Sequence, residues 1–217
     1  MMELHVIDTG HFKLDGGAMF GVVPKTLWSK AHPPDERNLC TWAMRCLLVV
    51  QGDRRILIDN GLGDKQDGKF FSHYEPHGEA TLDGSLKAVG YHRDDITDVF
   101  LTHLHFDHCG GSIRWNSARN GFEPAFRNAT YWSNEHHWKW ATRPNPREKA
   151  SFLKENILPI QESGQLRFVD VGRRSAEENL FIPEVFPGFG VLLVNGHTDA
   201  MMIPFIEHKG RTLIYMA

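Results

Sequence analysis

Three histidines and one aspartate lie within six residues of the segment "FLTHLHFDHCGGS", residues 100–112. The spacing H-x-H-x-D-H assigns them to His103, His105, Asp107 and His108. On a strand the first three would share one face, and in a loop after a strand the backbone could wrap all four around a centre. Imidazole and carboxylate ligands suit Zn, Fe, Mn or Ni, with Zn as the first choice for a histidine-rich site. The pattern therefore predicts a metal site at the end of a strand.

His197 is a further candidate ligand, far along the chain from the motif. It directly follows the apolar run "GVLLVNG", so it also lies at a predicted strand end, and Gly196 leaves room for its side chain. Alone, it would be interpreted as a turn histidine, but together with the motif it is interpreted as a ligand. Gly110 and Gly111, directly after the motif, are expected to let the backbone turn tightly behind the ligands.

Other reactive residues have simpler structural interpretations. Cys109 has no dedicated base, and a lone cysteine is usually a small buried apolar residue. His136, His137 and His208 are possible substitute ligands, but we expect them to be solvated or packed, because they fall on a predicted helix and in a predicted turn. Five aromatic residues either line an apolar substrate pocket or belong to the core: Phe70, Phe71, Trp132, Trp138 and Trp140.

Apolar runs bounded by turn residues predict the elements that must position these groups. The first part of the chain is expected to form antiparallel strands, and a helix ending at Gly90 then leads into a buried strand before the motif. The middle is predicted to be helical, with Ser133 as a cap and a break at Pro159. Strands return at the end, with a hairpin turn over 208–210. The predicted strands cover 3–8, 18–23, 40–50, 54–61, 94–103, 165–171, 180–186, 190–197, 201–208 and 211–217; helices are predicted within 80–91 and 145–160, and a strand followed by a helix within 129–142.

This order of elements looks like two similar halves. It favours two mixed β-sheets packed face to face with helices on the outer faces, an αββα sandwich of the α/β (α+β) class. We expect residues 1–217 to form a single domain.

Composition and charge indicate which partners to expect. The 217 residues carry 41% hydrophobic and 24% charged side chains and a formal net charge of -3, as in ordinary globular proteins. No run of Lys or Arg exceeds two residues, so neither nucleic acid nor an anionic membrane is an expected partner. The N-terminus lacks the pattern of a secretory signal, and no segment reaches the roughly 18 apolar residues of a membrane span. Three cysteines without a C-x-x-C favour a reducing compartment, and hence a cytoplasmic location.

The motif, its lead "VGYHRDDITDVFLT" (89–102) and the downstream "VNGHTDAMM" (194–202) resemble the metallo-β-lactamase superfamily, and within it the N-acyl homoserine lactonase branch. The resemblance extends from "ILIDNGLGD" (56–64) to the last strand. It implies two divalent metal ions, Zn above all, with Fe, Mn, Ni or Co as alternatives. The first metal would be held by His103, His105 and His197, and the second partly by Asp107 and His108. Asp59 matches a family position that orients the ligand loop without binding the metal.

The chain departs from the family pattern at two places. After Gly-His-Thr the family usually continues with Pro-Gly-His, whereas Asp199, Ala200 and Met201 stand here. The family also places a metal-bridging Asp after the strand that matches "RTLIYMA", and a further His later, but this sequence ends at Ala217. We expect the domain to be incomplete at its C-terminus; a natively short protein and substitute ligands are the alternatives.

The resemblance implies an enzyme, a metal-dependent hydrolase in which a metal-bound hydroxide opens a lactone or a similar ester or amide carbonyl, as in quorum quenching. Asp107 would act as the catalytic acid and pass a proton to the leaving group. The expected partner is a small-molecule substrate, and the expected assembly a monomer or homodimer. A thioester hydrolase of the glyoxalase II type is one alternative, and a binding or scaffold protein with a degenerate single-metal site is another. A di-iron redox protein is disfavoured, because such members place Glu where His105 stands.

Overall fold

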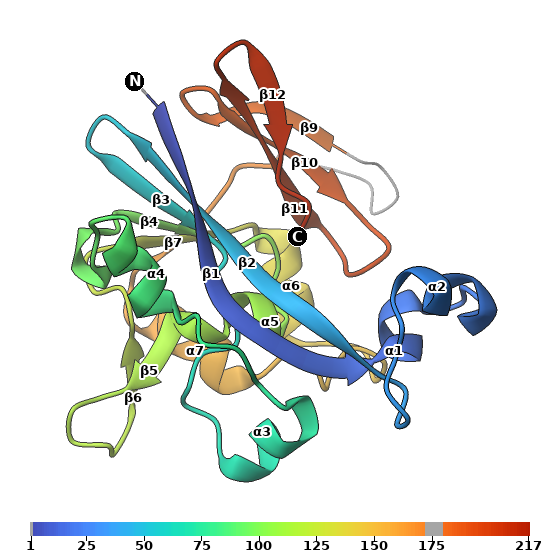
Figure 1. The fold of residues 1–217 in the computed structure, drawn as a ribbon. Helices are drawn as coiled ribbons and strands as arrows, with labels where there is room; N and C mark the ends of the chain where they lie inside the picture. Colours follow the sequence, from blue (N-terminus) through green and yellow to red (C-terminus); the bar gives the residue numbers. More distant parts are fainter. Residues whose placement is uncertain (1, 172–179) are drawn as a thin grey trace.

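A computed structural model describes residues 2–171 and 180–217, in which two β-sheets pack face to face (Figure 1). Within these residues the larger sheet has six strands and the smaller sheet four. In spatial order the larger sheet consists of β1 (Met2–Asp15), β2 (Leu39–Gln51), β3 (Arg54–Ile58), β4 (Asp98–Phe100), β7 (Thr130–Ser133) and β8 (Leu166–Phe168). The smaller sheet consists of β12 (Arg211–Ile214), β11 (Met201–His208), β10 (Phe189–Val194) and β9 (Leu180–Phe186). A separate hairpin pairs β5 (Ile113–Trp115) with β6 (Phe122–Pro124).

The larger sheet is mixed, and helices connect its parallel part. β1, β2 and β3 are antiparallel, whereas β3, β4, β7 and β8 are parallel. Parallel neighbours need crossover connections. Here α4 (Leu82–Ala88) lies between β3 and β4, and α6 (Glu135–Thr142) and α7 (Lys154–Glu162) lie between β7 and β8. The smaller sheet is antiparallel.

Successive side chains of the larger sheet belong alternately to two core clusters, one on each face of the sheet. Leu47 and Val49 face the smaller sheet, where they join Phe189 and Val191, whereas Leu48 between them faces the other way. This period of two follows from the pleat of a strand. The second cluster contains side chains of α4, α6 and α7: Leu86, Trp138, Ile157 and Ile160. Helices thus cover one face of the larger sheet and the smaller sheet covers the other, which confirms the predicted mixed α/β sandwich. The prediction that both sheets are mixed was wrong, because the described strands of the smaller sheet are joined by hairpins and pair antiparallel throughout.

The remaining helices lie at the ends of the strands. α1 (Gly16–Phe20) and α2 (Lys25–Ala31) form an extension at the far end of β1 and β2 (Figure 1). α3 (Gly68–Tyr74) packs beside β1. Around the motif lie α5 (Phe106–Cys109) and two 3-10 turns, η1 (Arg93–Asp95) and η2 (Gly110–Ser112). None of the helices in the described residues is long and apolar enough to cross a membrane.

Four local predictions were wrong. The strand predicted over 94–103 is limited to β4, because the side chain of His92 caps the 3-10 turn η1 before it. The segment 18–23, predicted as a strand, belongs to α1 and the turn after it: the carboxylate of Asp15 accepts a hydrogen bond from Ala18 N (3.0 Å), and Gly21, at φ 58°, ends the helix. The cap of α6 is Asn134 rather than Ser133. α7 continues through Pro159, which removes a single backbone donor while Ile160 beside it anchors the helix in the core.

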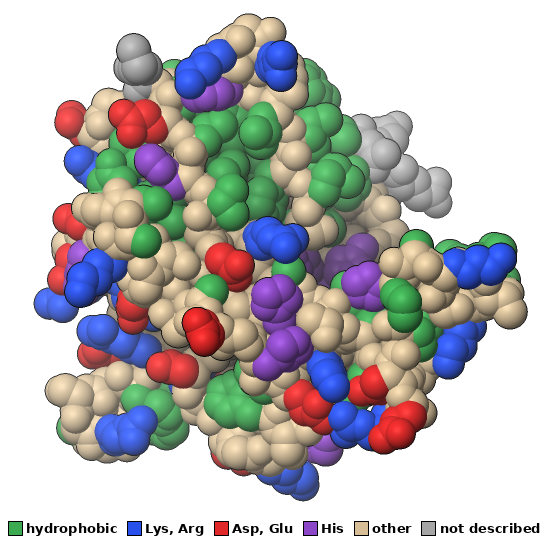
Figure 2. Space-filling model, in the orientation of Figure 1, with side chains coloured by type: hydrophobic (Ala, Val, Ile, Leu, Met, Phe, Trp, Pro, Cys, Tyr) green, Lys and Arg blue, Asp and Glu red, His purple; other side chains and the backbone are tan. Residues whose placement is uncertain are grey.

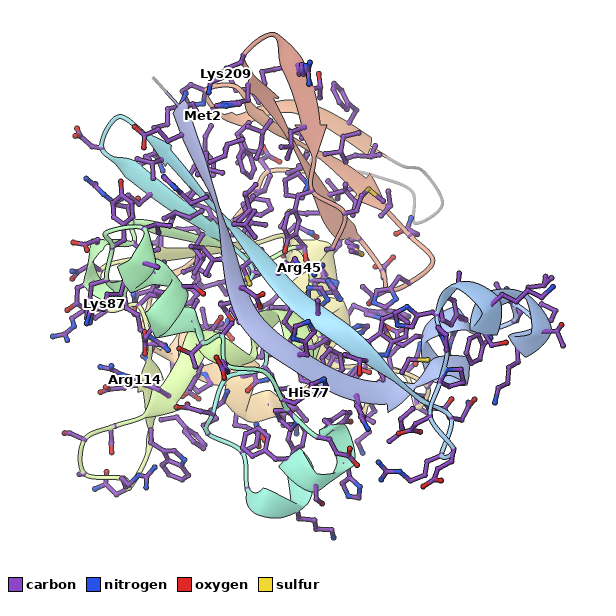
Figure 3. The ribbon with its side chains drawn as sticks, viewed as in Figure 1. Met2, Arg45, His77, Lys87, Arg114 and Lys209 are labelled. Carbon is purple, nitrogen blue, oxygen red and sulfur yellow. The ribbon has the colours of Figure 1, made fainter. Side chains whose placement is uncertain are left out.

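The end of the chain lies against the middle of β2. The hydroxyl of Tyr215 donates a hydrogen bond to the backbone oxygen of Arg45 (2.8 Å), and Figure 3 labels Arg45 at this place. The same hydroxyl lies 3.4 Å from Asp59 Oδ2. This contact joins the smaller sheet to the loop after β3, which supports the site described next.

Candidate metal centre

Two loops bring three imidazole rings together. His103 and His105 lie in the loop after β4, and His197 lies in the loop between β10 and β11. His197 Nε2 is 3.3 Å from His103 Nε2 and 3.1 Å from His105 Nδ1, and the three donor atoms lie within 4.8 Å of one another. Figure 2 shows exposed histidine side chains near the middle of this face, where Figure 3 labels His77 beside β1, and further histidine atoms recessed in a hollow beside the α1–α2 extension. We call His103, His105 and His197 the triad.

The surroundings keep the triad in its metal-binding form. Burial lowers the pKa of each of the three imidazoles, and neighbouring histidines lower it further; the pKa of His105 falls to about 2. At neutral pH the rings are therefore uncharged, each with a lone pair on one nitrogen, which is the form that ligates a metal. Three converging neutral imidazoles fit a divalent ion of the Zn type. Residues 2–171 and 180–217 hold no second group of three such residues with donor atoms equally close.

A buried carboxylate fixes the orientation of two rings. Asp59 accepts hydrogen bonds from Thr102 N (2.9 Å) and from Thr102 Oγ1 (2.8 Å), and Thr102 Oγ1 lies 3.1 Å from His103 Nδ1. Asp59 Oδ2 also lies 2.9 Å from His108 Nδ1. In both histidines Nδ1 is thus engaged, so Nε2 is the nitrogen available to a metal. This geometry supports the role predicted for Asp59, which stays a prediction.

Asp107 and His108 form a pair beside the triad, at the start of α5. His108 Nε2 lies 3.5 Å from Asp107 Oδ2, and the ring centroids of His103 and His108 are 4.1 Å apart. Burial alone would lower the pKa of His108, but the opposing effect of Asp107 and Asp59 is larger and raises this pKa to about 9. At neutral pH His108 is therefore protonated in this structure, so a second metal ion would have to replace the Nε2 proton before that atom could act as a ligand. Occupation of this place by a metal stays a prediction.

His137 cross-links the two loops of the triad. Its Nε2 accepts a hydrogen bond from Leu104 N (2.9 Å), so its Nδ1 carries the proton and donates to Asp199 O (2.6 Å). His137 is fully buried, and burial lowers its pKa to about 4. Both ring nitrogens are engaged with backbone groups, so the expectation of a packed histidine describes it well. Its bridge between the loops was missed, because the pairing of α6 with the loop after β10 is a long-range contact.

The glycines after the motif form a tight turn and also allow a close approach to the loop after β3. A Cβ atom on Gly110 would lie 2.0 Å from Leu62 O, and one on Gly111 would lie 2.3 Å from Asn60 O. Gly110 and Gly111 belong to the 3-10 turn η2, so the predicted tight turn is present, and Gly110 has ordinary helical angles in it. Bare backbone at both positions lets the motif dock directly on the loop after β3.

Lys65 also supports this docking. Its ammonium donates a hydrogen bond to Gly110 O (2.6 Å), and burial lowers its pKa from 10.5 to about 8. Because the pKa of Lys65 is lower in the folded chain, the unfolded chain binds more protons between pH 8 and 10.5. The burial of charged Lys65 therefore destabilises the folded chain fully below pH 8, and this destabilisation is lost as the pH rises to 10.5. The free energy of unfolding of the wild type, measured against that of Lys65→Met, is expected to rise by about 3 kcal/mol from pH 8 to 10.5. A difference that does not change with pH would contradict this assignment.

The remaining candidates separate into core and periphery. Cys109 Sγ donates to Leu104 O (3.3 Å), and burial raises the pKa of its thiol to about 12, so it stays protonated at neutral pH. Trp138 belongs to the core cluster with α7, and Trp132 packs on the cluster between the sheets. Phe70 and Phe71 pack near Phe106, while Trp140 bonds to Glu148. His136 and His208 take no part in the triad.

Sequence reasoning missed Thr102, Phe152 and Glu148. Thr102 directly precedes His103, so its place in the motif was a usable signal. The ring of Phe152 lies 4.7 Å from that of His105, and Glu148 Oε2 lies 3.8 Å from His105 Nε2. Both residues belong to the connection between α6 and α7, where no local pattern indicates proximity to the motif.

Comparison with known proteins agrees with this architecture. The profile of the metallo-beta-lactamase superfamily matches residues 45–209, so the chain belongs to that superfamily. The chain is 27% identical over 215 residues to the N-acyl homoserine lactonase AiiA of Bacillus thuringiensis subsp. kurstaki, covering 94% of this chain and 70% of that protein. An N-acyl homoserine lactonase of Bacillus cereus is 25% identical over 224 residues, covering 99% and 74%.

Solved structures show the same fold. A probable metal-dependent hydrolase from Staphylococcus aureus superposes with a TM-score of 0.82 at 28% identity, over 98% of this chain and 71% of that one. The dizinc quorum-quenching lactonase AidC, in complex with its product, superposes with a TM-score of 0.71 at 22% identity, over 99% and 70%. The predicted superfamily is thereby confirmed, and the curated relatives to which the chain is similar are N-acyl homoserine lactonases, the branch that the sequence resembles.

Proposed function

We propose that the chain hydrolyses the lactone ring of N-acyl homoserine lactones with the help of divalent metal ions. The observation that carries the proposal is the triad: the buried His103 and His105 and the exposed His197 are three uncharged imidazoles whose donor atoms converge within 4.8 Å. The similarity to N-acyl homoserine lactonases supports the choice of substrate class. Zn is the ion preferred by this donor set.

Different residues of the chain are assigned to metal binding and to ring orientation. His103 Nε2, His105 Nδ1 and His197 Nε2 would hold one ion, and Asp107 and His108 would contribute to a second. When bound, such ions polarise a carbonyl group and acidify a water molecule. Asp59 and Thr102 orient the rings of His103 and His108 through their Nδ1 atoms.

Asp107 is assigned to proton transfer. Its carboxylate is only partly buried, so it is accessible to a substrate lying over the triad. In the proposed reaction it takes up the proton that the attacking water loses and delivers it to the ring oxygen as the acyl C–O bond breaks. The product is then the open hydroxy acid, and no serine or cysteine nucleophile is needed.

The proposal also includes a cytoplasmic location, a small-molecule partner and an oligomeric state. The three cysteines of the described residues are free and buried, as expected in a reducing cytoplasm. A small-molecule substrate is the expected partner, and the enzyme would act as a monomer or homodimer.

The substrate assignment is tested by comparing kcat/KM for N-hexanoyl homoserine lactone with kcat/KM for a thioester, on the Zn²⁺-loaded chain. The proposal predicts faster hydrolysis of the lactone. Faster hydrolysis of the thioester would instead favour an enzyme of the glyoxalase II type. Stoichiometric metal without hydrolysis of either substrate would favour a single-metal binding protein.

A further inference from the structure

Glu148 lies between the two loops of the triad, in the segment that joins α6 to α7. Its Oε2 atom accepts hydrogen bonds from Trp140 Nε1 (3.0 Å) and from Thr198 Oγ1 (2.7 Å). Thr198 directly follows the candidate ligand His197. The backbone N–H of Glu148 donates to Asn145 Oδ1 (2.9 Å). The carboxylate is therefore fixed by α6, by its own turn and by the loop after β10.

The same carboxylate oxygen faces the outer nitrogen of His105. Glu148 Oε2 lies 3.8 Å from His105 Nε2, and both side chains are largely buried. The other ring nitrogen, His105 Nδ1, points towards His197 within the triad. His105 Nε2 is buried and has no hydrogen-bond partner among the residues that the structure describes. A buried polar atom without a hydrogen-bond partner costs free energy of folding. We therefore expect Nε2 of His105 to form a hydrogen bond in the functional state.

Ligation of a metal by His105 would favour a hydrogen bond from its Nε2 to Glu148. A neutral imidazole carries one proton, so a ring that binds a metal through Nδ1 carries it on Nε2. An Nε2–H group that faces a carboxylate forms a charge-assisted hydrogen bond, which is stronger than a neutral one. Carboxylates in this position fix the tautomer and the orientation of a ligating histidine. The ring of Phe152 also packs against the ring of His105, with the ring centroids 4.7 Å apart.

We propose that Glu148 is a positioning residue of the metal centre. It receives the Nε2–H of His105 and holds Thr198 next to His197, so that one carboxylate orients ligands from both loops. This role rests on the metal centre of the proposed function but is independent of the substrate. It also explains why a carboxylate is buried at this place, where an apolar side chain would fill the space at a lower desolvation cost.

The test is the affinity for Zn²⁺, measured by competition with a chromogenic chelator on the full chain. Replacing such carboxylate partners weakens metal binding by about 10–100-fold. Glu148→Ala is expected near the upper end of that range. Glu148→Gln is expected near the lower end, because the amide oxygen still accepts hydrogen bonds but lacks the charge. Glu162→Gln, at an exposed position of α7, is the matched control and should bind Zn²⁺ as the wild type does.

Thermal unfolding of the metal-free chains separates positioning from packing. Glu148→Gln keeps acceptors for Trp140 and Thr198, so it is expected to unfold close to the wild-type temperature and still bind Zn²⁺ more weakly; it also serves as the test where Glu148→Ala does not fold. Wild-type Zn²⁺ affinity in Glu148→Gln and Glu148→Ala would overturn the proposal. Absence of Zn²⁺ binding in the wild type would overturn the metal centre itself, whereas weakened binding without any lactone hydrolysis would leave the role of Glu148 standing.

Discussion

The variant His103→Ala is expected to lose metal and activity together. His103 offers Nε2 to the triad and is held in place by Thr102 and Asp59. Loss of a direct ligand should weaken Zn²⁺ binding by more than the roughly 100-fold that loss of an outer partner costs. Because a metal contributes several kcal/mol to the stabilisation of developing charge, kcat/KM for lactone should fall by about 10³-fold or more.

Equilibrium Zn²⁺ binding and lactone hydrolysis, measured on the same preparation, check this expectation. His136→Ala is the matched control, because His136 is exposed on α6 and lies outside the triad. It should leave both quantities unchanged. Wild-type turnover in His103→Ala would show that hydrolysis does not depend on the triad.

The variant Asp107→Asn is expected to separate turnover from metal binding. The asparagine side chain of this variant keeps the shape of the aspartate but neither takes up nor delivers a proton. General acid–base groups contribute about 10²–10⁴-fold to a rate, so kcat should fall within that range. The triad, which does not include Asp107, should retain its Zn²⁺.

Comparing kcat with the affinity of the tightest Zn²⁺ site tests the two roles separately. Asp53→Asn, in the exposed turn between β2 and β3, serves as the control for the loss of a carboxylate. An unchanged kcat in Asp107→Asn would remove the assigned role in proton transfer. A fall in kcat that matches the loss of metal from the triad would mean that Asp107 acts only through metal binding.

Local patterns predicted the parts of this site that are close together in sequence. The apolar strand before His103 and the one before His197 are visible as runs of buried residue types, and both end where the structure places the ligands. The two runs belong to different sheets, however. Only the packing of β10 against the larger sheet brings His197 within 3.3 Å of His103, and the resemblance to a known family, not periodicity, anticipated that convergence.

The contacts around the ligands were harder to predict, for a physical reason. Glu148 and His137 act through a few hydrogen bonds to loops that are distant in sequence. Neither residue interrupts a local pattern, since Glu148 stands in a polar turn and His137 in an amphipathic helix. In α1 a local signal was overlooked instead. Its apolar residues suited a strand, but the side-chain cap of Asp15 and the glycine at position 21 favour a short helix.

Removal and restoration of metal test the central claim most directly. The purified chain would be stripped with a chelator, its metal content confirmed by elemental mass spectrometry, and lactone hydrolysis measured as Zn²⁺ is added back. The account predicts that the stripped chain is inactive and that the rate returns in proportion to bound Zn²⁺, reaching a plateau once the sites are filled. Full activity in the metal-free chain would contradict it.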